Sequence, residues 1–201
     1  MLEGVCTALG LIQGVLVALN WRSNWIFYVA QTIGLFIFSW LNHLYGDMVN
    51  NAIYFVFGIL GFVLWGRKGQ SRIGVVGHGE RIVYLLFTAL ATFILYNFLK
   101  QSDDPMPLLD AVTTVTSFVA TYYMVKKKID TWVIWFVNDI LYVVEYFLLP
   151  ERAIMLGILN AVWTGLAVFS FVNWLRIMKK QKGERRSEML RKPSTLADWF
   201  S

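Results

Sequence analysis

One stretch of the chain, residues 132–146, combines side chains that stack on flat rings with side chains that can carry charge. If this stretch is a helix, with about 100° between successive residues, five of its side chains fall within a sector of roughly 80°. These are Trp132, Trp135, Asp139, Tyr142 and Tyr146. The opposite side holds Val, Ile, Phe and Leu, as expected for a helix that faces lipid or neighbouring helices.

Two further polar side chains, Asn138 and Glu145, flank this sector. An ionisable group at the centre of a membrane costs about 3 kcal/mol unless it faces a cavity or a partner. Asp139 and Glu145 therefore indicate a functional site. An aromatic slot with a carboxyl group at its base favours a flat, polar and positively charged ligand.

The composition places this stretch in a membrane. The 201 residues are 57% hydrophobic and 15% charged, and their mean hydropathy is +0.55. A chain of this kind has too little polar surface for a soluble domain. The N-terminus lacks the basic segment and the small-residue cleavage pattern of a signal peptide, so we expect the first apolar segment to be retained. A single cysteine, Cys6, excludes an internal disulfide.

The apolar segments have the length of membrane-spanning helices. A hydrocarbon core of about 30 Å takes roughly 20 helical residues to cross. The sequence therefore predicts an all-α integral membrane protein with seven transmembrane helices, at residues 3–20, 25–45, 47–66, 81–99, 106–125, 131–149 and 153–177.

The basic residues indicate the orientation. When alternate connections are counted, 16 of the 18 lysines and arginines lie on one side, and only Lys100 and Arg152 lie on the other. Because cytoplasmic segments retain Lys and Arg, we expect the N-terminus outside and the C-terminus in the cytoplasm. The basic tail, residues 179–201, suits contact with anionic membrane lipid, and we do not expect nucleic acid as a partner.

The first three predicted helices resemble the last three without gaps, at one constant offset along the sequence. Trp25 pairs with Trp132 at this repeat offset, and Gln31 pairs in the same way with Asn138. A single helix between the two triplets lets both enter the membrane in the same direction, which is the parallel repeat of sugar-exporter-like (SWEET-like) transporters. The sequence thus predicts a three, one, three arrangement: residues 1–66, a linker with the fourth helix at 67–105, residues 106–178, and the tail at 179–201.

The repeat adds candidate residues to those of the sixth helix, and a pathway is expected between the triplets. The candidates are Tyr28 and Gln31 in the second helix, Asp110, Thr114 and Ser117 in the fifth, and Asn160 and Trp163 in the seventh. Small hydroxyl residues also let membrane helices pack closely, which is the alternative for Thr114. Three tryptophans near helix ends are predicted to lie at the membrane interface: Trp40, Trp65 and Trp174.

These residues resemble a known family. The pair Trp132-x-x-Trp135 with its polar follow-up, preceded by Asp110-Ala-Val-Thr-Thr-Val-Thr-Ser-Phe-Val-Ala-Thr and Lys126-Lys-Lys, resembles the PnuC-type vitamin transporters. The likeness runs from the first helix to Trp174. It implies a bacterial inner-membrane protein that takes up nicotinamide riboside by facilitated diffusion. It also implies a cytoplasmic kinase that traps the substrate by phosphorylation, and a homotrimer in which each protomer has its own pathway.

The resemblance further implies that Trp132 and Trp135 stack on the substrate and that the polar residues after them hold its ribose or base. One departure concerns Asp139, where nicotinamide riboside transporters of this family tend to have asparagine. An acidic residue beside Tyr142 looks more like the thiamine or riboflavin branches. A carboxylate, in contrast, favours cationic nicotinamide riboside or thiamine over neutral riboflavin. Nicotinamide riboside is the expected substrate, with thiamine and riboflavin as alternatives.

Other classes of function find less support. The sequence has no GxxxxGK[ST] phosphate loop, so no nucleotide-driven step is expected. His43 and His78 are predicted on opposite sides of the membrane, so we expect no catalytic residues, no metal, no cofactor and no enzyme activity. A proton-coupled carrier using Asp139 or Glu145, and a receptor or scaffold without transport, remain alternatives.

Overall fold

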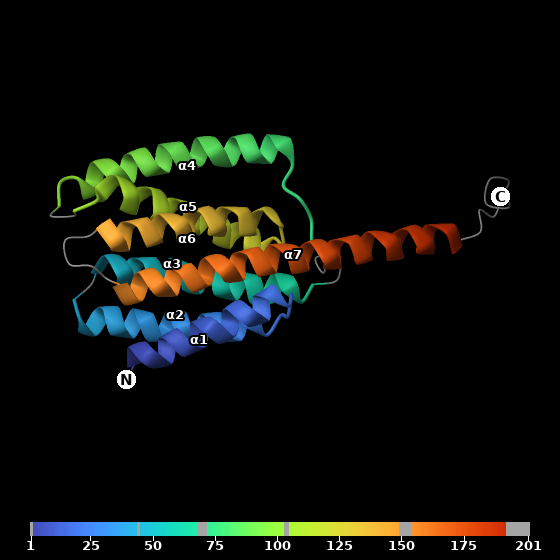
Figure 1. Cartoon of the computed structure of the whole chain (residues 1–201), viewed down its shortest axis with the longest axis horizontal. Coiled ribbons are helices and arrows are strands. Elements are labelled where there is room, and N and C mark those ends of the chain that lie inside the picture. The colour runs from blue at the N-terminus through green and yellow to red at the C-terminus, as the bar shows by residue number, and fades with distance from the viewer. Residues whose placement is uncertain (1, 44, 68–71, 103–104, 149–153, 192–201) are drawn as a thin grey trace.

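The computed structural model describes residues 2–43, 45–67, 72–102, 105–148 and 154–191. These residues form seven α-helices joined by short connections (Figure 1). The helices are α1 (Leu2–Ala18), α2 (Asn24–Leu41), α3 (Tyr45–Trp65), α4 (His78–Leu99), α5 (Pro107–Val125), α6 (Asp130–Leu148) and α7 (Ile154–Arg191).

The apolar segments form the helices that their length and hydropathy predict. Among the described residues, five helices are long and apolar enough to cross a membrane: α2, α3, α4, α5 and α7. Helix α1 is apolar but shorter, and α6 is a helix of 19 residues that carries three acidic residues. The fold is that of an all-α membrane protein.

The seventh helix is longer than predicted. We expected it to end near residue 177, whereas α7 continues for 38 residues to Arg191 and projects beyond the bundle (Figure 1). The added segment is rich in Lys, Arg, Gln and Glu, which are good helix formers, and it contains no proline that would stop the helix. The first part of the basic tail is therefore helical. Its last residues, 192–201, lie outside the described part of the chain.

Six of the helices pack in a closed ring. Neighbouring pairs around it are α1 with α2, α2 with α3, α3 with α5, α5 with α6, α6 with α7, and α7 with α1. Helix α4 packs on α5 alone among the described helices, at the edge of the bundle (Figure 1). No described residue of α4 is buried, although its partly buried Tyr84 packs against a small buried cluster of Val76, Val119 and Tyr123.

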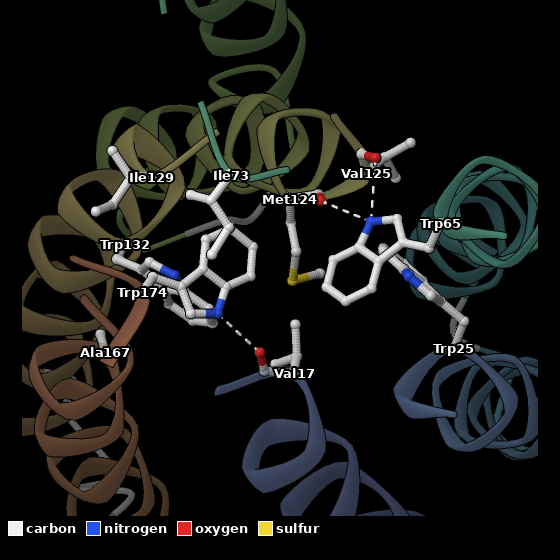
Figure 2. Close-up of a cluster of buried hydrophobic side chains, with 10 residues drawn as sticks. All are labelled: Val17, Trp25, Trp65, Ile73, Met124, Val125, Ile129, Trp132, Ala167 and Trp174. Carbon is white, nitrogen blue, oxygen red and sulfur yellow. Dashed lines mark hydrogen bonds between the residues drawn. The ribbon is translucent and has the colours of Figure 1, made fainter. Parts of the chain in front are cut away.

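A cluster of tryptophans fills the ring at one end, which we call the basic end because the turns with Arg22 and Lys126–Lys128 lie there. The tryptophan cluster consists of buried Trp25, Trp65, Trp132 and Trp174 with their apolar neighbours (Figure 2). The rings of Trp25 and Trp65 meet edge to face at 5.5 Å, and those of Trp132 and Trp174 at 5.3 Å. Aromatic pairs favour this geometry.

The position of two of these tryptophans corrects the sequence prediction. Trp65 is 5% exposed and Trp174 is fully buried, so neither lies at a lipid interface. The indole Nε1 of Trp65 donates to the carbonyls of Met124 and Val125, and that of Trp174 donates to the carbonyl of Val17 (Figure 2). Their proximity to helix ends reflects packing against the last turns of α5 and α1. Trp40, in contrast, is 60% exposed, which is compatible with an interface position.

Part of the α3–α4 connection, residues 72–77, lies across the basic end, and we call it the strap. The strap's backbone pairs with the α5–α6 turn, since the amide of Gly74 donates to the carbonyl of Lys127 at 3.0 Å and the amide of Ile129 donates to the carbonyl of Gly74 at 2.9 Å. Ile73 and Val76 of the strap are 5% and 4% exposed. The strap therefore adds apolar surface to the closed end of the ring.

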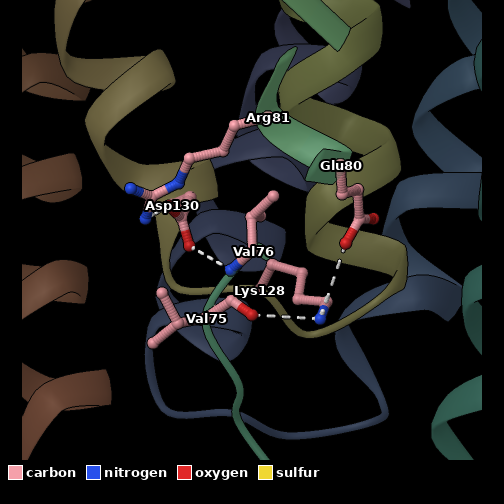
Figure 3. Close-up of polar contacts among 6 residues, drawn as sticks. All are labelled: Val75, Val76, Glu80, Arg81, Lys128 and Asp130. Carbon is pink, nitrogen blue, oxygen red and sulfur yellow. Dashed lines mark hydrogen bonds and ion pairs between the residues drawn. The ribbon is translucent and has the colours of Figure 1, made fainter. Parts of the chain in front are cut away.

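Charged side chains hold the strap in place (Figure 3). The amide of Val76 donates to Asp130 Oδ2 at 2.9 Å, while Asp130 Oδ1 accepts from Arg81 at 2.6 Å. Lys128 Nζ donates to the carbonyl of Val75 at 3.1 Å. Asp130 thus links the strap, the start of α4 and the start of α6.

Candidate functional site

The polar face of α6 lines a cavity of about 640 Å³ inside the ring of helices. Trp132, Trp135, Asp139 and Tyr142 all contribute to its wall. Their spacing of three or four residues places them one above another on a single side of α6, as the sequence predicts. The volume lies within the range of about 300–1,000 Å³ that is usual for small-molecule sites.

The other walls come from helices that precede and follow α4 in the sequence. Helix α2 contributes Tyr28, Gln31, Thr32 and Ser39; α3 contributes Asp47, Asn50, Asn51 and Tyr54; α7 contributes Asn160 and Trp163. The wall reaches from Ser39 and Asp47, near the end of the ring opposite the basic turns, to Met124 and Trp132 beside the tryptophan cluster. The cluster therefore closes the cavity at the basic end.

Eight of the thirteen candidate residues line this cavity in the described part of the chain: Tyr28, Gln31, Trp132, Trp135, Asp139, Tyr142, Asn160 and Trp163. The side chain of Glu145 lies outside what the structure describes. Four candidates do not line the cavity: Asn138, Asp110, Thr114 and Ser117.

Two of these four have other roles: Asn138 contacts the neighbouring helix α5, and Ser117 supports the cavity wall. Asn138 is 1% exposed, and its Oδ1 accepts a hydrogen bond from Thr116 of α5 at 2.7 Å. Ser117 Oγ lies 2.5 Å from the hydroxyl of Tyr54, which does line the cavity. Ser117 therefore orients a wall residue from behind.

Helix α1 supplies a wall that sequence reasoning missed. Its residues at the cavity are Cys6, Thr7, Gln13, Gly14 and Val17. Gln13 is 7% exposed, and it is the single strongly polar side chain in the middle of an apolar helix. This isolated amide could have indicated that α1 faces a cavity, because burying an amide without a hydrogen-bond partner is unfavourable.

Two glycines of α1 allow side chains of its neighbours to approach. A methyl group at Gly14 would overlap the ring of Trp163 and lie 2.7 Å from Leu166 Cδ2. A methyl group at Gly10 would overlap the amide of Gln31. Both Trp163 and Gln31 line the cavity, so the glycines set how far α1 stands from α7 and α2.

The cavity is acidic. Asp47 and Asp139 are in its wall, and none of its described lining residues is Lys, Arg or His. The described residues include no group of three or more His, Cys, Asp or Glu side chains placed to hold a metal ion. The described wall combines indole and phenol rings with amides, hydroxyls and carboxylates, an arrangement suited to holding a flat polar molecule.

One lysine lies beneath the closed end of the cavity. Lys127 is 6% exposed, and its Nζ lies 4.2 Å from the centre of the Trp65 ring, within the usual range for a cation–π contact. Burial lowers the pKa of Lys127 to about 8, because a low-dielectric environment disfavours the charged form.

Comparison with known proteins matches the whole bundle. A family model described as "Nicotinamide mononucleotide transporter" matches residues 1–176. The chain is 26% identical over 199 residues to the nicotinamide riboside transporter PnuC of Neisseria mucosa, covering 91% of this chain and 75% of that protein. It is 21% identical over 196 residues to the PnuC of Haemophilus influenzae, covering 90% and 80% of the two chains.

A solved structure has the same fold. The crystal structure of the vitamin B3 transporter PnuC superposes with a TM-score of 0.71 and 22% sequence identity, covering 89% of this chain and 82% of that one.

Proposed function

Because the chain belongs to the nicotinamide mononucleotide transporter family, we propose that it takes up nicotinamide riboside by facilitated diffusion. The family makes the chain a multi-pass membrane transporter and not an enzyme. The single observation that carries the choice of substrate is the cavity on α6, whose wall joins Trp132 and Trp135 with Asp139. Indole rings stack on a pyridinium ring, and a carboxylate balances its positive charge.

The charge of the cavity favours the riboside over its phosphorylated form. A phosphate brought near Asp47 and Asp139 would be repelled, and no described lining residue carries a compensating positive charge. The family model is described by the mononucleotide, whereas the relatives from Neisseria and Haemophilus are nicotinamide riboside transporters. The acidic wall supports the riboside for this chain. Phosphorylation by a cytoplasmic kinase then keeps the substrate inside, because the product no longer fits the site.

The architecture that we propose is a parallel repeat of α1–α3 and α5–α7, with α4 as the linker. Contacts within the ring support it. In this repeat α1 corresponds to α5 and α3 corresponds to α7, so the contact between α3 and α5 has its equivalent in the contact between α7 and α1. The tryptophan indoles support it too. Trp174 donates to the carbonyl of Val17, and Trp65 donates to that of Met124. These two acceptors are separated by the same number of residues as Trp25 and Trp132. Two similar halves around a central cavity suit alternating access.

The family resemblance and the distribution of charges also support proposals about the membrane location, the orientation and the oligomeric state. We propose a bacterial inner-membrane location, with the N-terminus outside and the basic end in the cytoplasm, where Lys and Arg are retained. We also propose a homotrimer, in which the unburied faces of α4 contact lipid or another protomer. A reporter protein that functions only in the cytoplasm should be active when it is fused after Lys182. Activity of a reporter that functions only outside the cytoplasm, fused at the same place, would contradict this orientation.

Thiamine and riboflavin remain alternative substrates, and the acidic wall favours thiamine of the two because it is a cation. A receptor or scaffold is the alternative of another class. It would bind ligand without moving it across a membrane.

Uptake by purified protein tests the proposal. The protein is reconstituted into vesicles without ATP or an ion gradient, and entry of labelled nicotinamide riboside is followed. We expect labelled riboside to equilibrate, unlabelled riboside to compete, and the mononucleotide to compete poorly. Entry no faster than into protein-free vesicles would overturn transport, and dependence on an imposed proton gradient would overturn facilitated diffusion.

A further inference from the structure

Asp139 is a buried carboxylate that faces the cavity and has no partner among the side chains that the structure describes. Its side chain is 6% exposed and lines the cavity wall. In the described part of the chain, no hydrogen bond or ion pair joins it to another residue. Its two nearest neighbours on the same face of α6, Trp135 and Tyr142, place aromatic rings one turn before and one turn after it.

Within the described wall of the cavity, no other element supplies a positive charge to this carboxylate. The titratable side chains in the described wall are Asp47 and Cys6, together with Tyr28, Tyr54 and Tyr142, and none of them is basic. A buried charge is normally paired with an opposite charge or with hydrogen-bond donors. A cation that enters the cavity would supply the counter-charge that the described residues do not give Asp139.

The two halves of the cavity differ at this point. Thr32 of α2 is the counterpart of Asp139 at the repeat offset and also lines the wall, but its hydroxyl donates to the carbonyl of Val29 at 3.0 Å. Thr32 is thus neutral and already satisfied. Of these two described counterparts, only Asp139 on α6 can carry a charge, so a bound ring with a localised positive charge has one preferred orientation.

We propose that Asp139 is a specificity-determining residue that selects substrates carrying a permanent positive charge on a flat heteroaromatic ring. The ring stacks against the aromatic side chains of α6, and its charge faces the Asp139 carboxylate. This inference rests on the proposed function and deepens it. The carrier accepts pyridinium or thiazolium ligands and rejects neutral molecules of the same shape.

A pair of ligands that differ in charge and hardly in shape tests the inference. Nicotinamide riboside is a cation, and its 1,4-dihydro form is neutral with the same ribose and carboxamide. Affinities of both are measured by titration calorimetry on the full-length detergent-purified protein and on Asp139→Asn. Glu184→Gln is the matched control, since it makes the same change of charge on the exposed extension of α7.

We expect the unmodified protein to prefer the cation by about tenfold or more, which corresponds to about 1.4 kcal/mol. Asp139→Asn should lose most of that preference by weakening the cation and sparing the neutral form, and Glu184→Gln should keep it. Retained binding of the neutral form shows that the variant is folded. If Asp139→Asn does not fold, Asp139→Glu replaces it and should keep the preference.

The outcomes separate two kinds of failure. Equal affinities of the unmodified protein for both ligands, or an equal loss for both in Asp139→Asn, would overturn the role of Asp139 and leave the proposed transport intact. Binding of neither ligand to the unmodified protein would overturn the proposed function itself.

Discussion

Asn20 and Lys127 are counterparts at the repeat offset, and both have a left-handed backbone, with φ of 60° and 51°. The amide of Asn20 donates to the carbonyl of Val17 at 2.9 Å, and the amide of Lys127 donates to the carbonyl of Met124 at 3.0 Å. The helices α1 and α5 therefore end in the same way. Left-handed angles are uncommon outside glycine, so their recurrence at this offset supports a repeat more strongly than apolar similarity does.

The same two carbonyls accept the tryptophan indoles, which gives the first prediction. Trp65→Phe removes the buried indole donor shared by the carbonyls of Met124 and Val125, and Trp174→Phe removes the one that donates to the carbonyl of Val17. Each should lower the free energy of unfolding by about 1–3 kcal/mol, and by similar amounts if the two sites are equivalent. Thermal unfolding in detergent measures this, with Trp40→Phe as the exposed control. A loss at one site only would contradict the equivalence of the two halves.

The second prediction concerns the packing of α3 on α2. A methyl group at Gly61 would overlap the ring of buried Trp25, whereas one at Gly165 would have nothing within 4 Å. Gly61→Ala should therefore destabilise the protein by about 1–3 kcal/mol through overpacking. Gly165→Ala should be neutral or stabilising, by up to about 1 kcal/mol, because alanine favours a helix. Equal unfolding temperatures for the two variants would show that α2 and α3 are less tightly packed than described.

Lys127 gives a prediction about pH. Its pKa is about 8 in the folded protein, below its ordinary value of 10.5. Between these values the unfolded chain binds more protons than the folded one, so the contribution of Lys127 to stability rises with pH. Below about pH 8 both states hold the proton, and the penalty is constant.

We therefore expect the unfolding temperature of the unmodified protein to rise, relative to Lys127→Met, as pH increases through the interval between these two pKa values. Lys126→Met is the control, because its side chain is exposed one position earlier. Curves for Lys127→Met and the unmodified protein that stay parallel over this interval would contradict a lowered pKa.

The fourth prediction concerns the strap. Asp130 accepts hydrogen bonds from the amide of Val76 and from Arg81. Asp130→Ala should increase hydrogen exchange at the strap amides, especially that of Val76, because both anchors are lost together. Glu80→Ala removes only a 4.0 Å ion pair with Lys128, and it should change exchange little. Unchanged exchange in Asp130→Ala would mean that the other contacts of the strap, including its backbone pairing with the α5–α6 turn and the bond from Lys128 to Val75, hold it without Asp130.

Local patterns predict much of this protein, and long-range packing accounts for what they miss. Hydropathy and charge predict seven helices, because a membrane helix satisfies its own backbone and needs only an apolar segment of sufficient length. Helical spacing predicts that Trp135, Asp139 and Tyr142 share a face. It does not distinguish a side chain that faces the cavity from one that contacts a neighbouring helix, and so Asn138, on the flank, turned out to bond α5.

Residues with no pattern around them were missed for the same reason. Gln13 is an isolated amide in an apolar helix, and nothing local indicates that α1 closes the ring against α7. Trp65 lies near a helix end, as interface tryptophans do, but its donation to the carbonyls of Met124 and Val125 depends on how α3 packs against α5.

The central claim is that the aromatic face of α6 binds the substrate inside the ring of helices. Titration of nicotinamide riboside into the unmodified protein, Trp135→Ala and Trp40→Ala tests it most directly. Trp135 lines the cavity and Trp40 is exposed outside it, so Trp135→Ala should weaken binding by about tenfold or more while Trp40→Ala leaves the affinity unchanged. Equal affinity in all three proteins would show that the substrate binds elsewhere.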